Sequence, residues 1–275
     1  MKHIHEKREY RKVLTIAGSD SGGGAGIQAD LKTISALGCY GMSVITALTA
    51  QNPRGVTGIH PVPPPFVAEQ MSAVFSDIGA DAVKIGMLYS AQLIRVVAEH
   101  LKKFGARNIV LDPVMVAQSG DKLLQDDAIQ AIKDYLMPLA DVVTPNLPEA
   151  RVLLGADIAG LEQMQTAAAA LAAYGSRSIL VKGGHLEENK STDLLYLAEE
   201  ERAIVLEAER IASRNNHGTG CTLSSAIAGY MAKGCSIEEA VRQAKTYIQN
   251  SIRAGAAYTI GKGHGPVHHF FEFWR

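Results

Sequence analysis

The chain has 275 residues, of which 47% are hydrophobic and 20% charged, a balance that supports a large core and argues against disorder. Its formal net charge is −1, with both signs spread along the chain, so nothing indicates a nucleic-acid or membrane surface. No apolar run approaches the roughly 20 residues of a membrane span, and the charged first residues do not resemble a secretory signal. The 3 cysteines fit a reducing, cytoplasmic location.

Buried strands and amphipathic helices alternate along the sequence. Strands are expected at residues 13–17, 43–49, 82–85, 108–111, 142–144 and 179–182, with a hairpin at 194–197 and 203–206. Helices are expected at residues 27–37, 65–76, 91–104, 126–136, 146–154, 161–174, 219–233 and 236–255. This alternation predicts crossover units and a mostly parallel central sheet in a three-layer α/β/α fold. Because the sequence shows no repeat, linker or break in composition, we expect a tail at residues 1–12 and a single domain at 13–275.

A glycine loop that leads into the penultimate helix has the strongest chemical signal. Gly218 and Gly220 free the backbone, and the first N–H groups of the following helix favour an anion such as phosphate. Cys221 lies on the same turn, where a thiol ionises more readily than in water. A tight loop that packs a helix against a sheet, with a cysteine as filler, explains the same residues.

Other polar residues follow the expected strands, where open α/β sheets bind their ligands. Asp112 and Glu149 are placed to hold Mg²⁺ through its waters, and Lys182, before two glycines, is placed to meet a phosphate. Each of the three also has a structural explanation, as a turn cap, a helix-dipole acid and a surface lysine.

The substrate end of the same edge is less clearly marked. Asp30, beside a second glycine-rich turn, offers a carboxylate to a ligand or to its helix dipole, while Gln51 and Met87 end strands. Residues 24–29 match a dinucleotide fingerprint in letters, but no acid follows between Asp30 and Glu69 to bind a ribose. A Walker phosphate loop is also absent from the sequence.

Taken together, ordered sequence blocks along nearly the whole chain carry a family resemblance. The blocks are residues 17–33 (AGSDSGGGAGIQADLKT), 83–88 (VKIGML), 111–115 (LDPVM), 144–150 (TPNLPEA), 182–185 (KGGH) and 217–222 (HGTGCT), with the tail 263–270 (GHGPVHHF). They resemble the hydroxymethylpyrimidine/phosphomethylpyrimidine kinases of thiamine biosynthesis, in the ribokinase-like superfamily. The thiamine-phosphate synthase domain fused to some relatives is not expected.

The resemblance implies a role for each matching residue. It places the aminopyrimidine at Gly18, Asp30, Gln51, Met87 and Val114. It assigns Mg²⁺ to Asp112 and Glu149, the ATP phosphates to Thr144, Asn146 and Lys182, the anion hole to Gly218, Thr219 and Gly220, and the base to Cys221. Many superfamily members carry Asp where this chain has Cys221, and the residues that contact adenine are left open.

The implied reaction is two successive phosphoryl transfers from ATP, first to the 5-hydroxymethyl group and then to the resulting phosphate. Residues 118–122 are a candidate lid, and the family implies a homodimer. The main alternative is a pyridoxine or pyridoxal kinase, or an enzyme with both activities, and Gln51, His185 and the tail favour the thiamine branch. A non-catalytic pyrimidine binder would have no use for the acids, lysine and thiol together.

Overall fold

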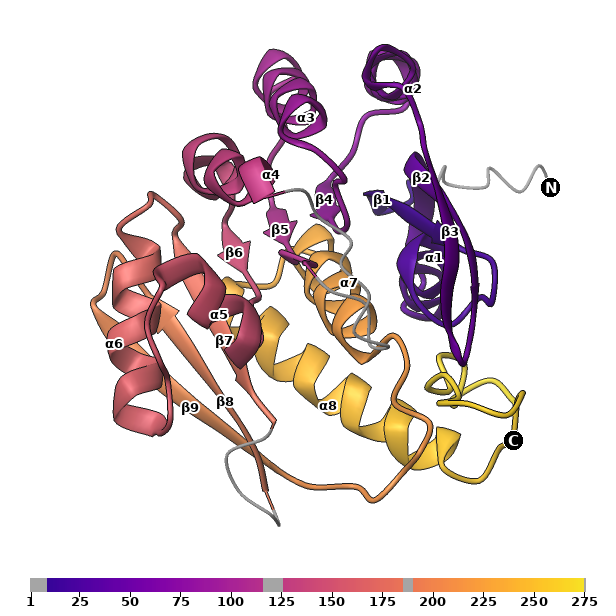
Figure 1. Cartoon of the computed structure of the whole chain (residues 1–275), viewed down its shortest axis with the longest axis vertical. Coiled ribbons are helices and arrows are strands. Elements are labelled where there is room, and N and C mark those ends of the chain that lie inside the picture. The colour runs from indigo at the N-terminus through magenta and orange to yellow at the C-terminus, as the bar shows by residue number, and fades with distance from the viewer. Residues whose placement is uncertain (1–8, 116–125, 185–189, 275) are drawn as a thin grey trace, which may run out of the picture.

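A computed structural model of the chain describes residues 9–115, 126–184 and 190–274, and all strands in these ranges form one sheet (Figure 1). The nine strands lie in the order β3-β2-β1-β4-β5-β6-β7-β8-β9. The strands are β1 (Lys12–Asp20), β2 (Tyr40–Asn52), β3 (Gly55–Pro61), β4 (Ala82–Ile85), β5 (Ile109–Leu111), β6 (Val142–Val143), β7 (Ser178–Gly183), β8 (Lys190–Leu197) and β9 (Arg202–Glu209). The strands from β2 to β7 in this order pair in parallel, and β3, β8 and β9 pair antiparallel. The mostly parallel sheet is confirmed.

Helices cover both faces of the sheet, as a three-layer fold requires. They are α1 (Gly26–Ala36), α2 (Pro64–Asp77), α3 (Ala91–Lys103), α4 (Asp126–Ala131), α5 (Leu147–Leu154), α6 (Leu161–Ala172), α7 (Thr219–Ala232) and α8 (Ile237–Gly255). One buried cluster joins the sheet to α2, α3, α4, α5 and α6, and a second joins it to α1, α7 and α8. Within the described residues, none of these helices is long and apolar enough to cross a bilayer.

Two elements differ from the sequence prediction. The segment Gly55–Pro61 forms an antiparallel edge strand on β2, although its side chains are largely exposed and give no apolar signal. The helix expected at residues 126–136 is α-helical only to Ala131 and continues as a π-helical turn, Ile132–Leu136, and a 3-10 turn, Met137–Leu139. Pro138 lacks an N–H and crowds the preceding turn, so a regular α-helix cannot continue through it.

Candidate active site

A cavity of about 650 Å³ lies at the carboxyl ends of the parallel strands. It extends from the ends of β1 and β4, past the start of α7, to α8. Its lining includes every site residue predicted from the sequence except Asp30 and Thr144. The predicted residues in the lining are Gly18, Gln51, Met87, Asp112, Val114, Asn146, Glu149, Lys182, Gly218, Thr219, Gly220 and Cys221. Ligands of open α/β sheets bind at this edge of the sheet, and the residues that we predicted on that basis lie together in the fold.

Two glycine-rich loops meet at the mouth of α7. Gly218, the residue before the helix, has a φ of 79°, a left-handed conformation that favours glycine. A Cβ on Gly218 would overlap the carbonyl oxygen of Gly24, and a Cβ on Gly24 would overlap the ring of His217. The loop after β1 and the loop before α7 therefore touch backbone to backbone, with no space for a side chain.

Asp20 joins these two loops, a role that we did not predict from the sequence. Its carboxylate accepts hydrogen bonds from the backbone N–H groups of Gly22 (2.8 Å), Gly24 (3.0 Å) and Ala25 (2.8 Å). It also accepts one from His217 Nε2, at 2.9 Å. Burial alone would raise the pKa of Asp20, but the bonds from His217 and the amides lower it below its ordinary value. The sequence contained a signal for this role, because a glycine-rich turn leaves several backbone N–H groups without partners and an acidic residue within the turn can accept hydrogen bonds from them.

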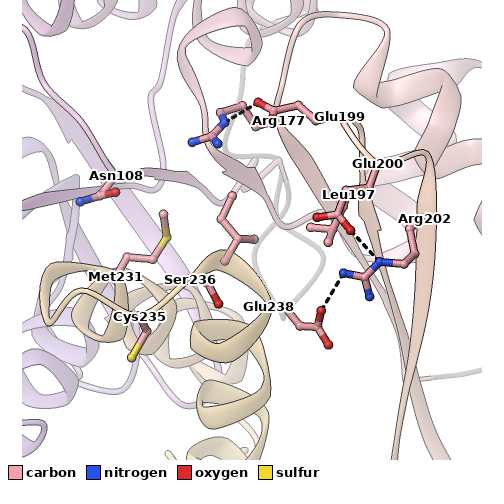
Figure 2. A pocket seen from close by; sticks show the side chains of 11 residues that line it. Asn108, Arg177, Leu197, Glu199, Glu200, Arg202, Met231, Cys235, Ser236 and Glu238 are labelled. Atoms are coloured by element: carbon pink, nitrogen blue, oxygen red, sulfur yellow. Dashed lines mark hydrogen bonds and ion pairs between the residues drawn. The ribbon is translucent and has the colours of Figure 1, made fainter.

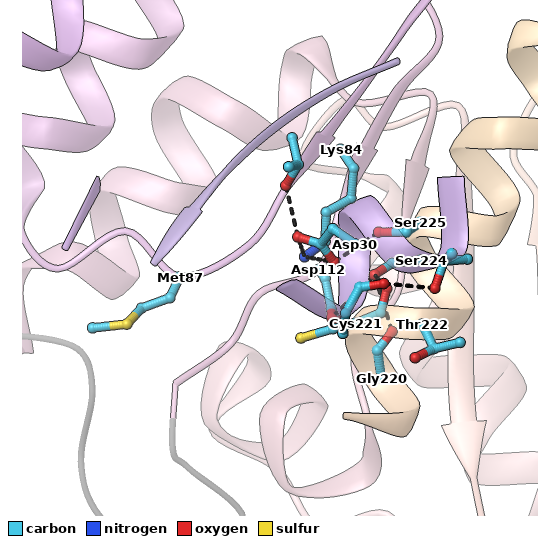
Figure 3. Close-up of polar contacts among 12 residues, drawn as sticks. Asp30, Lys84, Met87, Asp112, Gly220, Cys221, Thr222, Ser224 and Ser225 are labelled. Carbon is cyan, nitrogen blue, oxygen red and sulfur yellow. Dashed lines mark hydrogen bonds and ion pairs between the residues drawn. The ribbon is translucent and has the colours of Figure 1, made fainter. Parts of the chain in front are cut away.

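Cys221 lies in the first turn of α7 and faces the cavity, partly exposed. Figure 3 shows its sulfur on the side of the helix toward Met87. Burial raises the pKa of the thiol to about 11, although the nearby Lys84 ammonium acts in the opposite direction. The expectation that the thiol at this helix end ionises more readily than in water is therefore not met, because the effect of burial exceeds that of the Lys84 ammonium.

Asp30 lies beneath the cavity instead of lining it. The residue is fully buried, and its carboxylate accepts a hydrogen bond from Thr15 Oγ1 (2.6 Å). It also accepts from Ser225 Oγ (2.7 Å) and Lys84 Nζ (2.9 and 3.0 Å), which Figure 3 shows around it. With both oxygens engaged inside the protein, the predicted contact between Asp30 and the pyrimidine ring is not supported. Lys84 was missed, although a lysine inside the apolar strand at residues 82–85 signals a buried partner.

The phosphate side of the cavity is built around Asp112. Its Oδ1 accepts from Lys182 Nζ (2.9 Å) and from Thr144 Oγ1 (3.1 Å), so the buried Thr144 meets the site only through Asp112. Burial alone would raise the pKa of Asp112, but the Lys182 ammonium holds it below its ordinary value. Asn146 and Glu149 form a capping box at the start of α5. Burial raises the pKa of Glu149 to about 7, against the effect of Lys182.

Asp112 and Glu149 fit a Mg²⁺ ion that is bound together with a nucleotide. The described residues contain no group of three or more side chains that could hold a metal by themselves. Mg²⁺ usually keeps several waters and uses one or two carboxylates together with substrate phosphates. Asp112 and Glu149, both buried and both lining the cavity, are a donor set of that kind.

The far end of the cavity, toward α8, was not predicted. Its walls are apolar where Leu223, Ile248 and Ile252 meet. Lys245 Nζ forms a 2.5 Å ion pair with Asp193 there. This end is suited to a flat ring with polar edges. The sequence of residues 236–255 shows an amphipathic helix, but it does not tell which buried residues of that helix face a ligand and which face the core.

A second hollow, of about 350 Å³, lies at the opposite edge of the sheet, near the amino ends of β5 and β7, the start of β9 and the start of α8 (Figure 2). Its two arginines are already paired, Arg177 with Glu199 and Asp141, and Arg202 with Glu200 and Glu238. These arginine side chains are about half exposed to solvent, whereas the Lys182–Asp112 pair of the first cavity is mostly buried.

Solved structures with the same fold define the class of protein, that of small-molecule kinases. An ADP complex of Bacillus subtilis pyridoxal kinase has a TM-score of 0.89 and 37% identity, and covers 96% of this chain and 100% of its own. A phosphomethylpyrimidine kinase from Clostridium difficile has a TM-score of 0.78 and 44% identity, and covers 88% of this chain and 99% of its own. The ribokinase-like fold predicted from the sequence is confirmed.

The sequence comparisons then give the family. The model of the phosphomethylpyrimidine kinase family matches residues 20–268, and the chain belongs to this family. The hydroxymethylpyrimidine/phosphomethylpyrimidine kinase of Rhizobium meliloti is 54% identical over 263 residues, which are 95% of this chain and 98% of the relative. The chain spans 52% of the thiamine biosynthesis bifunctional protein of Geobacter sulfurreducens, at 54% identity. The resemblance inferred from the sequence blocks is confirmed.

Proposed function

We propose that the protein transfers phosphoryl groups from ATP to hydroxymethylpyrimidine and then to its monophosphate, for thiamine biosynthesis. The observation that carries this proposal is one continuous cavity that joins an apolar end at Met87 to an anion-binding glycine loop, with Cys221 between them. Relatives of 43–54% identity bear the name of this kinase pair or of thiamine biosynthesis.

The acceptor ring occupies the end of the cavity near β1, β2 and β4. Met87 and Val114 supply apolar contacts to the faces of the ring, and Gly18 leaves room for its edge because a side chain there would press on the Met87 sulfur. Gln51 Oε1 accepts a hydrogen bond from Thr49 Oγ1 (3.1 Å), which orients the amide. The free part of that amide then recognises the polar edge of the ring.

The γ-phosphoryl group lies over the start of α7. The backbone N–H groups of Gly218, Thr219 and Gly220 at this helix end donate hydrogen bonds to its oxygens, and Lys182 adds a full positive charge from the facing side. Bound through Asp112 and Glu149, Mg²⁺ would neutralise charge on the phosphates and orient them. Catalysis is then mainly positioning and charge stabilisation, as in other phosphoryl transfers.

Cys221 takes the proton of the acceptor hydroxyl during the first transfer. In the second transfer the acceptor is a phosphate monoester, which is largely ionised at pH 7 and needs little help from a base. The two half-reactions therefore make different demands on the same residue, and this difference gives a test.

Cys221→Ser is expected to lower kcat of the first transfer by at least about 10-fold and that of the second by less than about 3-fold. Each half-reaction is followed separately, with hydroxymethylpyrimidine or its monophosphate as the only acceptor and ADP release as the readout. Equal losses in both half-reactions would assign Cys221 a binding or structural role.

Vitamin B6 alcohols are the second class of acceptor to test. Pyridoxal kinases have the higher TM-scores, near 0.88, but share only 36–37% identity with this chain. The same assay with pyridoxal and pyridoxine as acceptors distinguishes a single from a dual activity. A kcat/KM for pyridoxal above that for hydroxymethylpyrimidine would overturn the proposed assignment.

The proposal includes a homodimer in the cytoplasm. The edge strand β3 exposes an unpaired backbone edge, and the neighbouring β2 exposes the apolar side chain of Leu48, and a second copy can cover both. The candidate lid at residues 118–122 and His185 lie outside the described residues.

A further inference from the structure

Lys84 is a fully buried lysine at the floor of the active-site cavity. It lies in β4, its side chain has no solvent exposure, and it contributes to the lining of the cavity together with Met87 and Cys221. Its ammonium lies against Gly86, where a Cβ would come within 2.7 Å of Nζ. An ammonium without water costs several kcal/mol, so its position under a reactive site requires an explanation.

The charge of Lys84 is fixed in place by three elements of the fold. Asp30 of α1 holds the ammonium at 2.9 Å, and Asp30 is itself held by Thr15 of β1 and Ser225 of α7. Burial alone would lower the pKa of Lys84, but the Asp30 carboxylate raises it above its ordinary value, so the lysine stays charged. The cation can neither move to solvent nor lose its proton near pH 7.

The geometry of α7 directs this charge toward Cys221. Ser225 and Cys221 are four residues apart, so they lie on the same face of the helix in adjacent turns. Since Ser225 bonds Asp30 and Asp30 bonds Lys84, the thiol lies one helical turn from the buried ion pair, as Figure 3 shows.

Four charged groups act on the thiol, from different elements. They are Lys84 of β4, Asp30 of α1, Asp112 after β5, and Lys182 of β7. Lys84 is the group that most strongly lowers the pKa of Cys221, while Asp30 and Asp112 raise it. Removing Lys84 leaves Asp30 without its cation, while Lys182 still opposes Asp112.

We propose that Lys84, held by Asp30, is a positioning residue that stabilises negative charge on Cys221 during the first phosphoryl transfer. The thiol first gives its proton to solvent. The thiolate then takes the proton of the acceptor hydroxyl as that oxygen bonds to the γ-phosphorus, the bond from phosphorus to the β-phosphate oxygen breaks, and ADP leaves. Asp30, which the family resemblance assigned to the pyrimidine ring, acts instead through Lys84.

The test is Lys84→Met, which keeps the length of the side chain and removes its charge. The pH dependence of Cys221 alkylation by iodoacetamide, read by mass spectrometry at this residue, is expected to shift upward by about one pH unit or more. The first transfer is expected to fall at least about 10-fold in kcat and the second less than about 3-fold, with little change in KM for the pyrimidine. An unchanged alkylation profile overturns the proposal.

Lys245→Met is the matched control, since Lys245 is also buried against an aspartate but lies at the α8 end of the cavity. It should leave the alkylation profile of Cys221 as in the parent protein. If both lysine variants shift the profile equally, the effect is a general response to lost charge, and the proposal fails.

A double variant addresses the case in which Lys84→Met does not fold. Replacing both members of a buried ion pair by apolar residues is often neutral or stabilising, so Lys84→Met/Asp30→Leu removes the unpaired charge. We expect this variant to fold, by its thermal unfolding midpoint. Its alkylation profile and first transfer should change in the same direction as in Lys84→Met but by less, because Asp30, which raises the pKa of Cys221, is lost together with the lysine. Parental values for both would show that the pair serves only to join α1 to β4.

This inference rests on the proposed role of Cys221 as the base, and the two can fail separately. If Cys221→Ser affects both transfers equally while Lys84→Met shifts the alkylation profile, the base role fails and the electrostatic coupling stands. If Cys221→Ser is selective for the first transfer but Lys84→Met leaves the profile unchanged, the coupling fails alone.

Discussion

His269 is a histidine of the C-terminal segment that is buried against the first turn of α7, with 5% of its surface exposed. Its Nε2 lies 3.1 Å from Thr222 Oγ1. Burial lowers its pKa to about 3, from 6.5. Below pH 6.5 this histidine therefore binds a proton in the unfolded chain but not in the folded protein. The free energy of unfolding decreases as the pH falls from 6.5 toward 3.

We expect the free energy of unfolding to fall by about 2 kcal/mol between pH 7 and pH 5 from this residue alone. His269→Gln, which cannot be protonated, should flatten that part of the profile in urea unfolding measured at several pH values. His60→Gln, at an exposed histidine of β3, is the control and should keep the parental slope. A slope that persists in His269→Gln would mean that other groups bind the protons.

For single residues, the position in the sequence predicted well which side chains lie near the site. It predicted less well whether a side chain points into the cavity or into the core. Asp112 and Lys182 follow buried strands, and the parallel sheet necessarily brings them to one edge. Asp30 lies on a helix, where a rotation of one position turns a side chain from the cavity to the core. Only the tertiary contacts with Thr15, Lys84 and Ser225 reveal that it points inward.

Among the elements, the loop before α7 is the most constrained by packing. Gly218→Ala would force a Cβ into the carbonyl oxygen of Gly24 and would strain a φ of 79°. We expect both transfers to lose at least about 100-fold in kcat, because the misplaced amides serve the γ-phosphoryl group in each. The measurement is kcat for each half-reaction together with the thermal unfolding midpoint.

Gly160→Ala is the control for this variant, because a Cβ there meets nothing within 4 Å and the backbone is extended. It should retain parental rates for both acceptors. If Gly218→Ala remained active while losing several degrees of thermal stability, the loop would be a structural junction and the anion would bind elsewhere.

The elements that could not be predicted from the sequence are those that form only through contacts with distant parts of the chain. The six sequence blocks locate the strand ends and the glycine loops, because glycine and buried apolar runs are local signals. β3 contains no regular apolar alternation and exists because β2 offers it an unpaired edge. The contact between Gly24 and Gly218 joins segments nearly 200 residues apart, and no local pattern reveals it.

At the scale of the whole molecule, the two edges of the sheet have different surfaces. The outer strand β9 exposes Arg202, Glu207 and Glu209. Charged side chains on an edge strand disfavour its pairing with a strand of another chain. The opposite edge strand, β3, has the sequence GVTGIHP and contains no charged residue other than its histidine. Beside it, β2 exposes Leu48, of which 47% is accessible. The β2–β3 edge is therefore the surface on which a second copy is expected.

Leu48→Lys is expected to shift the protein from a dimer toward a monomer, measured by light scattering during size-exclusion chromatography over a range of concentrations. A charge at the centre of an apolar contact cannot be solvated once the partner covers it, so association weakens while the fold, in which Leu48 is already exposed, is retained. Val205→Lys introduces the same charge at a comparably exposed aliphatic position of β9, 42% accessible, and should leave the mass unchanged. A parent protein that elutes as a monomer at every concentration, or a Val205→Lys variant that dissociates instead, would contradict the β2–β3 interface.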